Sequence, residues 1–487
     1  MNDTGNIKSE LIAKLRDAAE LEHQYMCQYL YAALSIKNKP DATCKPYQLE
    51  MARRWVSMLY LVARQEMEHL ALVNNLLRSI GAAPHFYRAN IGDVYDPAHS
   101  MLAHIHIGAE MPDSKHDPHP VPQEYAFTPF DLNTIKRFVC MESPNYTTLK
   151  KTPGEPFPPW CFTCAGEVGS DEQEENEVSA GDVQKLYKEI EKLFKQLPPE
   201  AFDTEASEQP AIIQQYDIFV FPVTDHASAQ QAIDLIAEQG EGINKQPTYQ
   251  SHYRRFIDIY HDYCAELCPD WDWQEGPDGP PMDDYDPATA SFQPAYVLQK
   301  DPSEGTISND YTKKLFALFN QAYETQVTLL TGLYATKNQK PTAYPYFASA
   351  LGQEAFSPFM TMIIRTCGEI LLRLKTDNPL GPVGPNFHLS SDLQADLKEP
   401  FEKDEQGNDK LKPRFGNIEE ILKRTEDFST RLQELVDNGN PPTIDGVDPA
   451  FIQKRMEYML ENANRISTNL RRIYQLGIYQ ALDAGQF

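Results

Sequence analysis

The chain has 487 residues, 41% of them hydrophobic, and a formal net charge of −27 at pH 7. It is too long for one small domain, and its hydrophobic content is typical of a globular protein with a substantial core. The negative charge argues against nucleic acid and against an anionic membrane surface as partners, because binding to either requires a positive patch.

The sequence lacks the usual features of membrane and secreted proteins. It has no run of about 18 apolar residues, so no ordinary membrane-spanning helix is expected. Its first residues lack the basic segment followed by an apolar one that marks a secretory signal. Eight cysteines in so long a chain are too few for a disulfide framework. We therefore expect a cytoplasmic protein with mostly free thiols.

Two long helices are predicted in the N-terminal part of the chain. Residues 7–37 and 47–80 have apolar residues at helical spacing, and Gly81 ends the second range. Residues 85–128 are rich in His, Pro, Asp and Gly and predict a long irregular crossover that covers one end of these helices. Histidines clustered on such a segment are more often solvent-facing or individually hydrogen-bonded than metal-bound, and this expectation applies to His85, His104, His106, His116 and His119.

The next stretch alternates helices with irregular segments. A shorter helix is predicted within residues 128–143, capped by Thr128 or Asp131. An acidic insertion follows at about 161–182, and it begins with a C-x-x-C pair, Cys161 and Cys164, for which a structural metal or a redox role is the alternative to free thiols.

Further elements lead to a domain boundary. Residues 183–197 predict a short exposed amphipathic helix, and residues 216–225 predict an extended strand. Residues 227–242 predict a helix that ends in glycines, and Ser251 caps the one after it. We place a first domain at 1–265, a Pro/Asp-rich linker at 266–304 and a second all-helical domain at 305–487.

Glu66 and His69 lie three residues apart inside an otherwise apolar stripe of the helix at 47–80. This spacing puts a carboxylate and an imidazole on one helix face, and the two groups together suit iron or manganese. Alone the pair is weak evidence, because Glu and His often fall three apart on solvated helix faces. Further ligands are therefore needed from other helices.

Candidates for those further ligands occur along the chain. Glu22 sits at the edge of the apolar face of the first helix, and Tyr29 follows about two turns later on the same side. A carboxylate buried there is costly unless it is paired, hydrogen-bonded or metal-bound. The other candidates lie near predicted helix ends: Glu142, Glu238, Glu241 and His252.

Several blocks of the sequence resemble the ferritin-like carboxylate bundle, in which two helices each supply a Glu and two others each supply a Glu-x-x-His. ELEHQYMCQYLYA and RQEMEHLALVNNLLRSIGAAP are similar to its first helical pair. Together with RFVCMESP, VTDHASAQQAIDLIAEQGEG and SHYRRF, they resemble a bacterial ferritin-like family that includes the iminophenylpyruvate dimer synthase type of domain in the violacein and rebeccamycin pathways. The resemblance spans residues 7 to about 265.

The resemblance implies an all-α fold, with a ferritin-like four-helix bundle, long irregular crossovers and a second helical region. It implies two catalytic residues, Tyr29 and Glu66, and a set of metal ligands: Glu22, Glu66, His69, Glu142, Glu238 and His252. The fourth helix departs from the family pattern, because it reads Glu-x-x-Glu at Glu238 and Glu241. His252 can supply the missing imidazole, and Glu241 is the substitute for Glu238. Glu20 and His23 are expected at the surface or in contact with the ligands.

The function implied by the resemblance is a metal-dependent oxidase or oxygenase of specialised metabolism, acting on a small amino-acid-derived substrate with dioxygen or peroxide. Its cofactor is expected to be iron, as a di-iron pair, or manganese. Haem is not supported by a motif, since the chain has no C-x-x-C-H. We expect a small-molecule substrate, no nucleic acid, no membrane and a possible homo-oligomer. The alternative is a non-catalytic ferritin-like scaffold or metal-binding protein that serves a partner.

Overall fold

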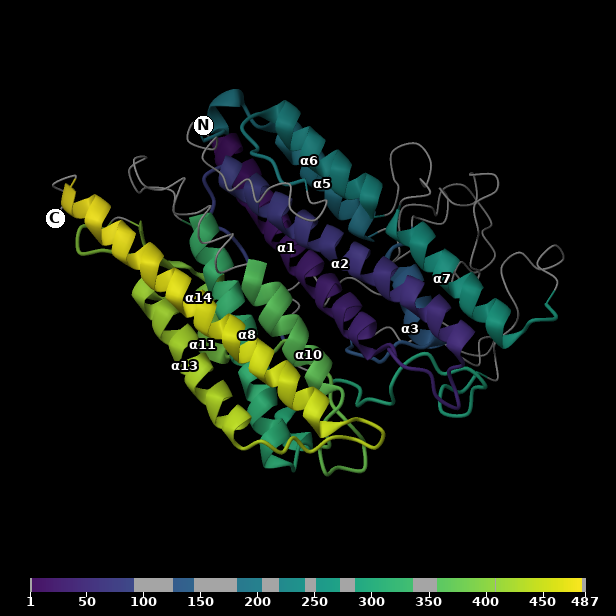
Figure 1. Ribbon diagram of the computed structural model, residues 1–487. Coiled ribbons are helices and arrows are strands. Elements are labelled where there is room, and N and C mark those ends of the chain that lie inside the picture. The colour runs from purple at the N-terminus through teal and green to yellow at the C-terminus, as the bar shows by residue number, and fades with distance from the viewer. Residues whose placement is uncertain are drawn as a thin grey trace. The chain divides into compact units, whose positions relative to one another are not determined.

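The computed structural model describes residues 2–91, 126–143, 182–203, 219–240, 251–271, 285–335, 357–407 and 409–483. In these ranges almost all regular structure is helical (Figure 1). The exception is an antiparallel ribbon of β1 (Phe401–Lys403) and β2 (Asp409–Leu411), in which Phe401 pairs with Leu411 and Lys403 with Asp409. The all-α class predicted from the sequence is confirmed.

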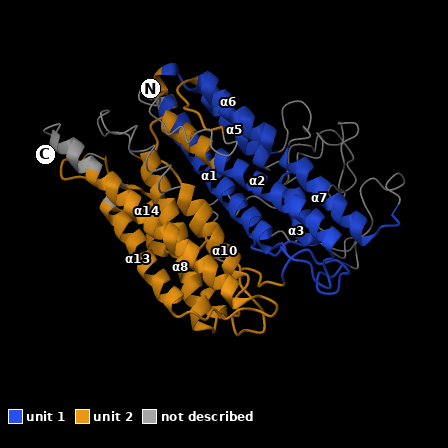
Figure 2. Cartoon of the chain, viewed as in Figure 1, with its two compact units in different colours: residues 1–69, 94–199, 226–296 blue, residues 70–93, 200–225, 297–487 orange. Residues whose placement is uncertain are grey.

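The chain divides into two compact units, each assembled from separate stretches of sequence (Figure 2). Unit 1 comprises residues 1–69, 94–199 and 226–296, and unit 2 comprises residues 70–93, 200–225 and 297–487. The predicted boundary at 266–304 stays a prediction.

Unit 1 is built from helices, and the first two are long. α1 is Asn2–Ser35 and α2 is Pro46–Ser79, close to the ranges predicted from the apolar spacing. The first part of α2, as far as His69, belongs to unit 1 and runs antiparallel beside α1 (Figure 1), where His69 contacts Glu22. The remaining helices of its described part are α3 (Leu132–Met141), α5 (Asp182–Gln196), α6 (His226–Gln239) and α7 (His252–Leu267), while the 3-10 turn η4 (Pro199–Ala201) spans the change from unit 1 to unit 2. α3 packs along α7, and α5 packs against both α1 and α6.

Local capping decides where α3 and α7 begin. The side chain of Asp131 accepts a hydrogen bond from the Thr134 N–H, so Asp131 is the cap, not Thr128. Ser251 caps α7 in the same way through the Arg254 N–H, as predicted. Because α7 starts directly after Ser251, His252 occupies its first position, while Glu142 ends α3 as its C-cap residue.

An aromatic cluster holds α2 against α7 in unit 1. Trp55 is fully buried, and its ring centroid lies 5.3 Å from that of Tyr263, 5.5 Å from that of Phe130 and 5.9 Å from that of Phe292. The indole N–H donates to Asp262 at 3.3 Å, so its polar atom is also satisfied. This packing fixes the relative position of two helices that carry candidate ligands.

Unit 2 contains the end of α2 and a series of helices in the C-terminal part of the chain. α8 (Asp310–Ala335) packs against α13 (Ile418–Asp437), which packs in turn against α14 (Pro449–Asp483). The shorter elements are η6 (Glu304–Thr306), the π-helical turn η8 (Phe359–Ile364), α10 (Arg365–Leu371), α11 (Ser391–Lys398) and α12 (Pro413–Gly416).

Gly332 permits a close approach between α8 and α12 in unit 2. A Cβ at this position would meet the carbonyl of Phe415 closer than real Cβ contacts allow, and that carbonyl belongs to the backbone and cannot swing away. Gly332→Ala is therefore expected to lower the free energy of unfolding by about 1–3 kcal/mol. Gly5→Ala is the matched control, because Gly5 lies on the exposed part of α1 with no atom within 4 Å of its added Cβ. Thermal denaturation should show a lower midpoint for the first variant and an unchanged or slightly higher one for the second.

Three further predictions from the sequence concern the strand, the cysteines and the crossover histidines. Residues 219–225, the described part of the predicted strand, contain no named strand, so that prediction is wrong for these residues. Among the described cysteines, Cys140 is disulfide-bonded, and Cys44, Cys264 and Cys367 are free thiols. Cys161 and Cys164 lie outside the described residues, as do all the crossover histidines except His85.

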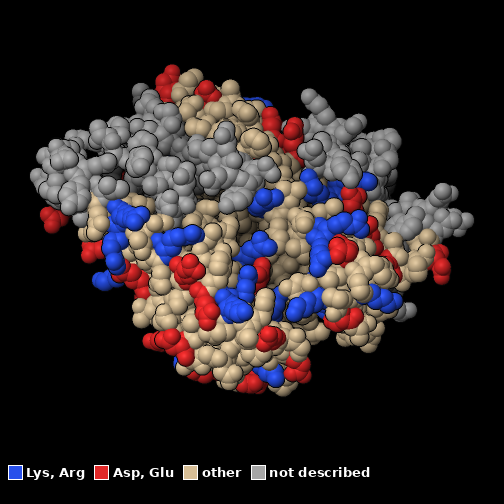
Figure 3. Space-filling model, in the orientation of Figure 1, with Lys and Arg blue, Asp and Glu red and all other residues tan. Residues whose placement is uncertain are grey.

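The surface carries charges of both signs. On the face drawn in Figure 3, Lys and Arg side chains lie interspersed with Asp and Glu side chains. Within the described ranges, no helix is long and apolar enough to cross a membrane.

Candidate metal centre

Five of the six predicted metal ligands meet inside unit 1. These five residues are at most 4% exposed. α1 supplies Glu22, α2 supplies Glu66 and His69, Glu142 follows α3, and His252 begins α7. Residues from α1, α2, the end of α3 and the start of α7 therefore form one buried polar group.

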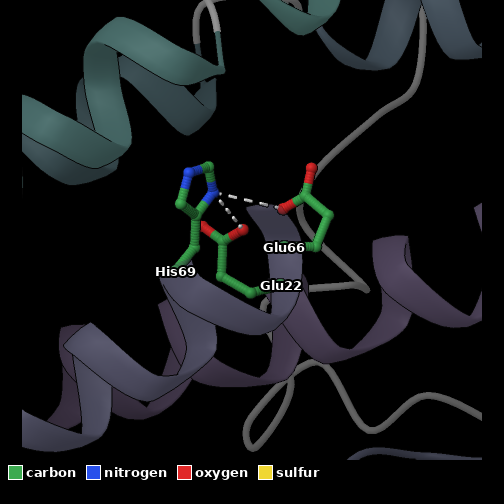
Figure 4. Close-up of side chains that lie close together, drawn as sticks. All are labelled: Glu22, Glu66 and His69. Carbon is green, nitrogen blue, oxygen red and sulfur yellow. Dashed lines mark hydrogen bonds and ion pairs between the residues drawn. The ribbon is translucent and has the colours of Figure 1, made fainter. Parts of the chain in front are cut away.

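The five side chains form two clusters that share Glu66. One cluster comprises Glu22, Glu66 and His69, and the other comprises Glu66, Glu142 and His252. Within each cluster, one potential ligand atom from every residue lies within 4.8 Å of those of the other two. Figure 4 shows the first cluster, with His69 facing both carboxylates.

The two oxygens of Glu66 point to different histidines. Its Oε2 lies 3.3 Å from His69 Nδ1, and its Oε1 lies 2.9 Å from His252 Nδ1. Glu22 Oε2 is also 3.3 Å from His69 Nδ1, and Glu142 Oε2 is 3.6 Å from His252 Nδ1. Glu66 thus stands between two similar sets of one carboxylate and one imidazole.

Two tyrosines hold the outer carboxylates. The Tyr29 hydroxyl donates to Glu142, and the Tyr187 hydroxyl donates to Glu22. Both rings are buried, and the Tyr29 ring is packed edge-on against Phe138, 4.7 Å away between centroids. Burial and the charge of Glu142 raise the pKa of Tyr29 well above its usual range, so its hydroxyl stays protonated and remains a donor.

Tyr187 is a site residue that sequence reasoning missed. The helix at 183–197 was expected to be exposed, but α5 buries the face that carries Leu186, Tyr187 and Ile190. The spacing of these residues is a signal for a buried face. The contact between this face and Glu22 depends on how α5 packs against α1. The local sequence of α5 carries no information about that packing.

Gln239 is a second residue that was missed. Its side-chain oxygen lies 2.9 Å from His69 Nε2, on the side of the ring opposite the carboxylates. Its amide nitrogen donates to Glu68 Oε1 at 3.4 Å. Gln239 therefore reaches the centre from α6, whereas its neighbour Glu238 was the predicted ligand.

Glu238 does not join the other five predicted ligands. Its side chain is exposed, while Ile236 and Ala237 on the same helix are buried. Successive helical residues are about 100° apart, so Glu238 lies about 200° around the helix from the buried Ile236 and faces away from the interior. The prediction that Glu238 lies in the bundle interior is wrong, and Glu241 lies outside the described residues.

Glu20 and His23 are both 2% exposed, so they are not surface residues, and neither belongs to the two clusters.

Protons compensate the buried carboxylates when no cation is present. Burial raises the pKa of Glu22 to about 7, and the charge of Glu66 adds to the rise. Burial opposes protonation of His252, but the charges of Glu66 and Glu142 outweigh it and raise the His252 pKa to about 9. The pKa of His69 is raised well above its usual range, because hydrogen bonds with Glu22 and Glu66 outweigh the opposing effect of burial. Burial favours a higher Glu66 pKa, but the charge of His252 lowers it.

A small cavity adjoins the centre. Its volume is about 20 Å³, which accommodates a molecule the size of water. The carboxylates of Glu22, Glu66 and Glu142 and the ring of His69 line one side, and residues of α5 and α6, among them Tyr187 and Ala237, line the other. The cavity therefore offers space for a water-sized molecule beside these donors.

The pattern of the ferritin-like family matches residues 15–261, about half of the chain and nearly the same range as the predicted resemblance. The chain belongs to the ferritin-like family. All five donors of the centre lie within this range, and the resemblance inferred from the sequence is confirmed.

Two curated relatives cover much of this ferritin-like chain. Dichlorochromopyrrolate synthase from Lentzea aerocolonigenes is 23% identical over 418 residues, which are 78% of this chain and 36% of that protein. The 2-imino-3-(indol-3-yl)propanoate dimerase from Chromobacterium violaceum is 26% identical over 360 residues, which are 68% of this chain and 29% of that protein. The chain therefore spans about a third of the length of these relatives.

Among solved structures, a ferritin-like protein from Caulobacter vibrioides is 19% identical with a TM-score of 0.36, over 71% of this chain and 93% of that one. A likeness this weak adds nothing to the fold assignment.

Proposed function

We propose that unit 1 holds two metal ions, iron or manganese, between α1, α2, the end of α3 and the start of α7. The donor set fits them: carboxylates and imidazoles are the ligands of these metals in helical bundles. Three carboxylates and two neutral imidazoles carry three negative charges, and two divalent cations would neutralise them and leave a net charge of +1.

Unsatisfied buried atoms support the same assignment. Glu66 Oε1 and both ring nitrogens of His252 are buried and make no hydrogen bond of acceptable geometry, although Glu66 Oε1 and His252 Nδ1 are only 2.9 Å apart. Buried polar atoms in proteins are nearly always satisfied, and exceptions need an explanation. For Glu66 Oε1 and His252 Nδ1, lone pairs that converge on a common cation give that explanation.

We infer that the protein is a metal-dependent oxidoreductase that acts on a small amino-acid-derived substrate with dioxygen or peroxide. The observation that carries this inference is the shared, fully buried Glu66 between two Glu/His clusters beside a small cavity. Bound iron or manganese would supply the redox chemistry with the oxidant. The named reaction of the Chromobacterium violaceum relative supports an aryl-substituted 2-imino acid as the substrate class, and a place in specialised metabolism follows from it.

The residues of the chain have separate roles in this proposal. Glu66 would contribute to both metal sites, and Glu22, His69, Glu142 and His252 would complete the two sets of ligands. We propose that Tyr29 acts through Glu142, by holding the carboxylate with its protonated hydroxyl, and that Tyr187 does the same for Glu22.

The tyrosines provide a test of the two-cluster arrangement. Tyr29→Phe should weaken binding of one metal ion by about 10–100-fold and leave the other unchanged, because such outer partners tune ligand orientation and basicity. Tyr187→Phe should affect the other ion to a similar degree. Manganese titration by calorimetry, with melting temperatures as a control for folding, measures both. Equal weakening of both ions by either variant would contradict the assignment of one tyrosine to each cluster.

Oxygen uptake tests the enzymatic part of the proposal. Protein reconstituted anaerobically with Fe²⁺ or Mn²⁺ should consume dioxygen, or hydrogen peroxide supplied in its place, when given the imine formed from indole-3-pyruvate and ammonium. Metal-free protein and the Glu66→Ala variant should not exceed the rate of the substrate mixture alone.

A non-catalytic ferritin-like scaffold or metal-binding protein that serves a partner is the second candidate. The small size of the cavity favours it, because an aryl imino acid does not fit into about 20 Å³. Stoichiometric metal binding without any substrate-dependent uptake of dioxygen or peroxide would support this candidate over the enzyme.

A further inference from the structure

The two histidines of the centre have unlike surroundings. His69 faces Glu22 and Glu66 with Nδ1 and places Nε2 2.9 Å from the oxygen of Gln239. His252 faces Glu66 and Glu142 with Nδ1, but its Nε2 is fully buried and makes no hydrogen bond to any residue that the structure describes. One ring has an outer acceptor and the other does not.

Glu68 fixes the orientation of the Gln239 amide. A carboxylate only accepts hydrogen bonds when it is ionised, so the amide presents its nitrogen to Glu68 and its oxygen to His69. That oxygen can be satisfied only by an N–H. His69 therefore carries its proton on Nε2 and keeps the Nδ1 lone pair for a cation between Glu22 and Glu66.

The carboxylates of the two clusters do not differ in this way. Each cluster shares Glu66, and each outer carboxylate accepts one tyrosine hydroxyl, from Tyr187 to Glu22 and from Tyr29 to Glu142. The contacts beyond the ligands therefore differ mainly at the histidines.

We propose that Gln239 makes the cluster of Glu22, Glu66 and His69 the tighter of the two metal sites, so that this cluster fills first and the centre loads in two steps. The inference rests on the proposed two-metal centre. An acceptor on the outer nitrogen of a metal-bound imidazole raises its basicity and fixes its ring, and losing such a partner costs about 10–100-fold in metal affinity. His252 faces its carboxylates with Nδ1 but lacks such an outer acceptor, because its Nε2 is buried and makes no hydrogen bond to a described residue.

The test is an anaerobic calorimetric titration of the full-length metal-free protein with Mn²⁺. The wild type should bind two ions, with the first about 10–100-fold tighter than the second. Gln239→Leu keeps the size of the side chain but removes the acceptor, and it should weaken the first step by about that factor and leave the second. Glu238→Gln, the exposed neighbour on α6, is the matched control and should leave both steps unchanged.

Removal of each histidine assigns the steps independently of Gln239. His69→Ala should lose the tight step, and His252→Ala should lose the weak one. Two equal steps in the wild type, a tight step that survives His69→Ala, or an unchanged first step in a folded Gln239→Leu variant would overturn the inference while leaving a two-metal centre. No Mn²⁺ or Fe²⁺ binding by the wild type would instead overturn the proposed function on which the inference rests.

Discussion

Glu66→Ala is expected to reduce the metal content of the protein from two ions per chain to none, whereas His69→Ala and His252→Ala should each retain one ion. Glu66 belongs to both clusters, and each of its oxygens faces a different histidine. Its removal leaves each cluster with one carboxylate and one imidazole, too few ligands to hold iron or manganese. Elemental analysis of freshly purified protein after gel filtration measures the effect.

The control for this prediction is Glu238→Ala, because Glu238 is an exposed acid on α6 and should not affect metal content. The scaffold hypothesis predicts a different outcome. In an ordinary polar network, removing one of three neighbouring acids relieves repulsion and can stabilise the fold. Unchanged metal content in the Glu66→Ala variant, together with a higher melting temperature, would contradict the metal centre and support such a network.

Raising the pH from 6.5 to about 9 is expected to destabilise the metal-free protein. The folded-state pKa of His252 is raised from 6.5 to about 9, so the folded state binds this proton more tightly than the unfolded state. The resulting stabilisation is fully present below pH 6.5 and is lost as the pH rises through about 9. The shift in the His252 pKa corresponds to roughly 3 kcal/mol of folding free energy, and the raised pKa of His69 acts in the same direction.

Glu22 adds a contribution of the same sign at lower pH. Its pKa is raised from 4.5 to about 7, so its share of the stabilisation is lost between these values. Melting temperatures of chelator-treated protein across this pH range check the prediction. The fall should be shallower in the His252→Gln variant, and a melting temperature that rises between pH 6.5 and 9 in the wild type would contradict it.

Bound metal should oppose this loss of stability at high pH. Cations replace the protons on His69, His252 and Glu22, so apparent metal affinity should increase with pH over the same range. The stability gained from a saturating metal concentration should therefore be larger at pH 9 than at pH 6.5.

The errors at α6 have a simple geometric cause. Glu238 forms part of a Glu-x-x-Glu sequence, yet it projects away from the buried apolar face of α6, which comprises Ala229, Ala232, Ile233, Ile236 and Ala237. The helical period alone therefore indicated that Glu238 points outward. Gln239 gave no comparable signal, since a neutral amide near a helix end is ordinary on its own.

The sequence by itself determined the class of the fold and placed Glu66 and His69 of the candidate site together. Apolar residues at helical spacing predicted α1 and α2 nearly to their ends, and the three-residue spacing of Glu66 and His69 put both side chains on one face of α2. These features are local, because a helix places residues three and four apart together whatever surrounds it. The likeness of several blocks to the ferritin-like family added Glu22, Glu142 and His252.

Tertiary structure decided how these residues combine. Glu142 and His252 stand at the ends of α3 and α7, and only the packing of those helices on each other brings both side chains to Glu66. The tyrosine on Glu22 comes from a helix that the sequence pattern describes only as amphipathic, and the partner of His69 comes from α6. Hydrogen bonds between side chains 165 and 170 residues apart depend on distances set by the whole bundle, and no local spacing encodes them.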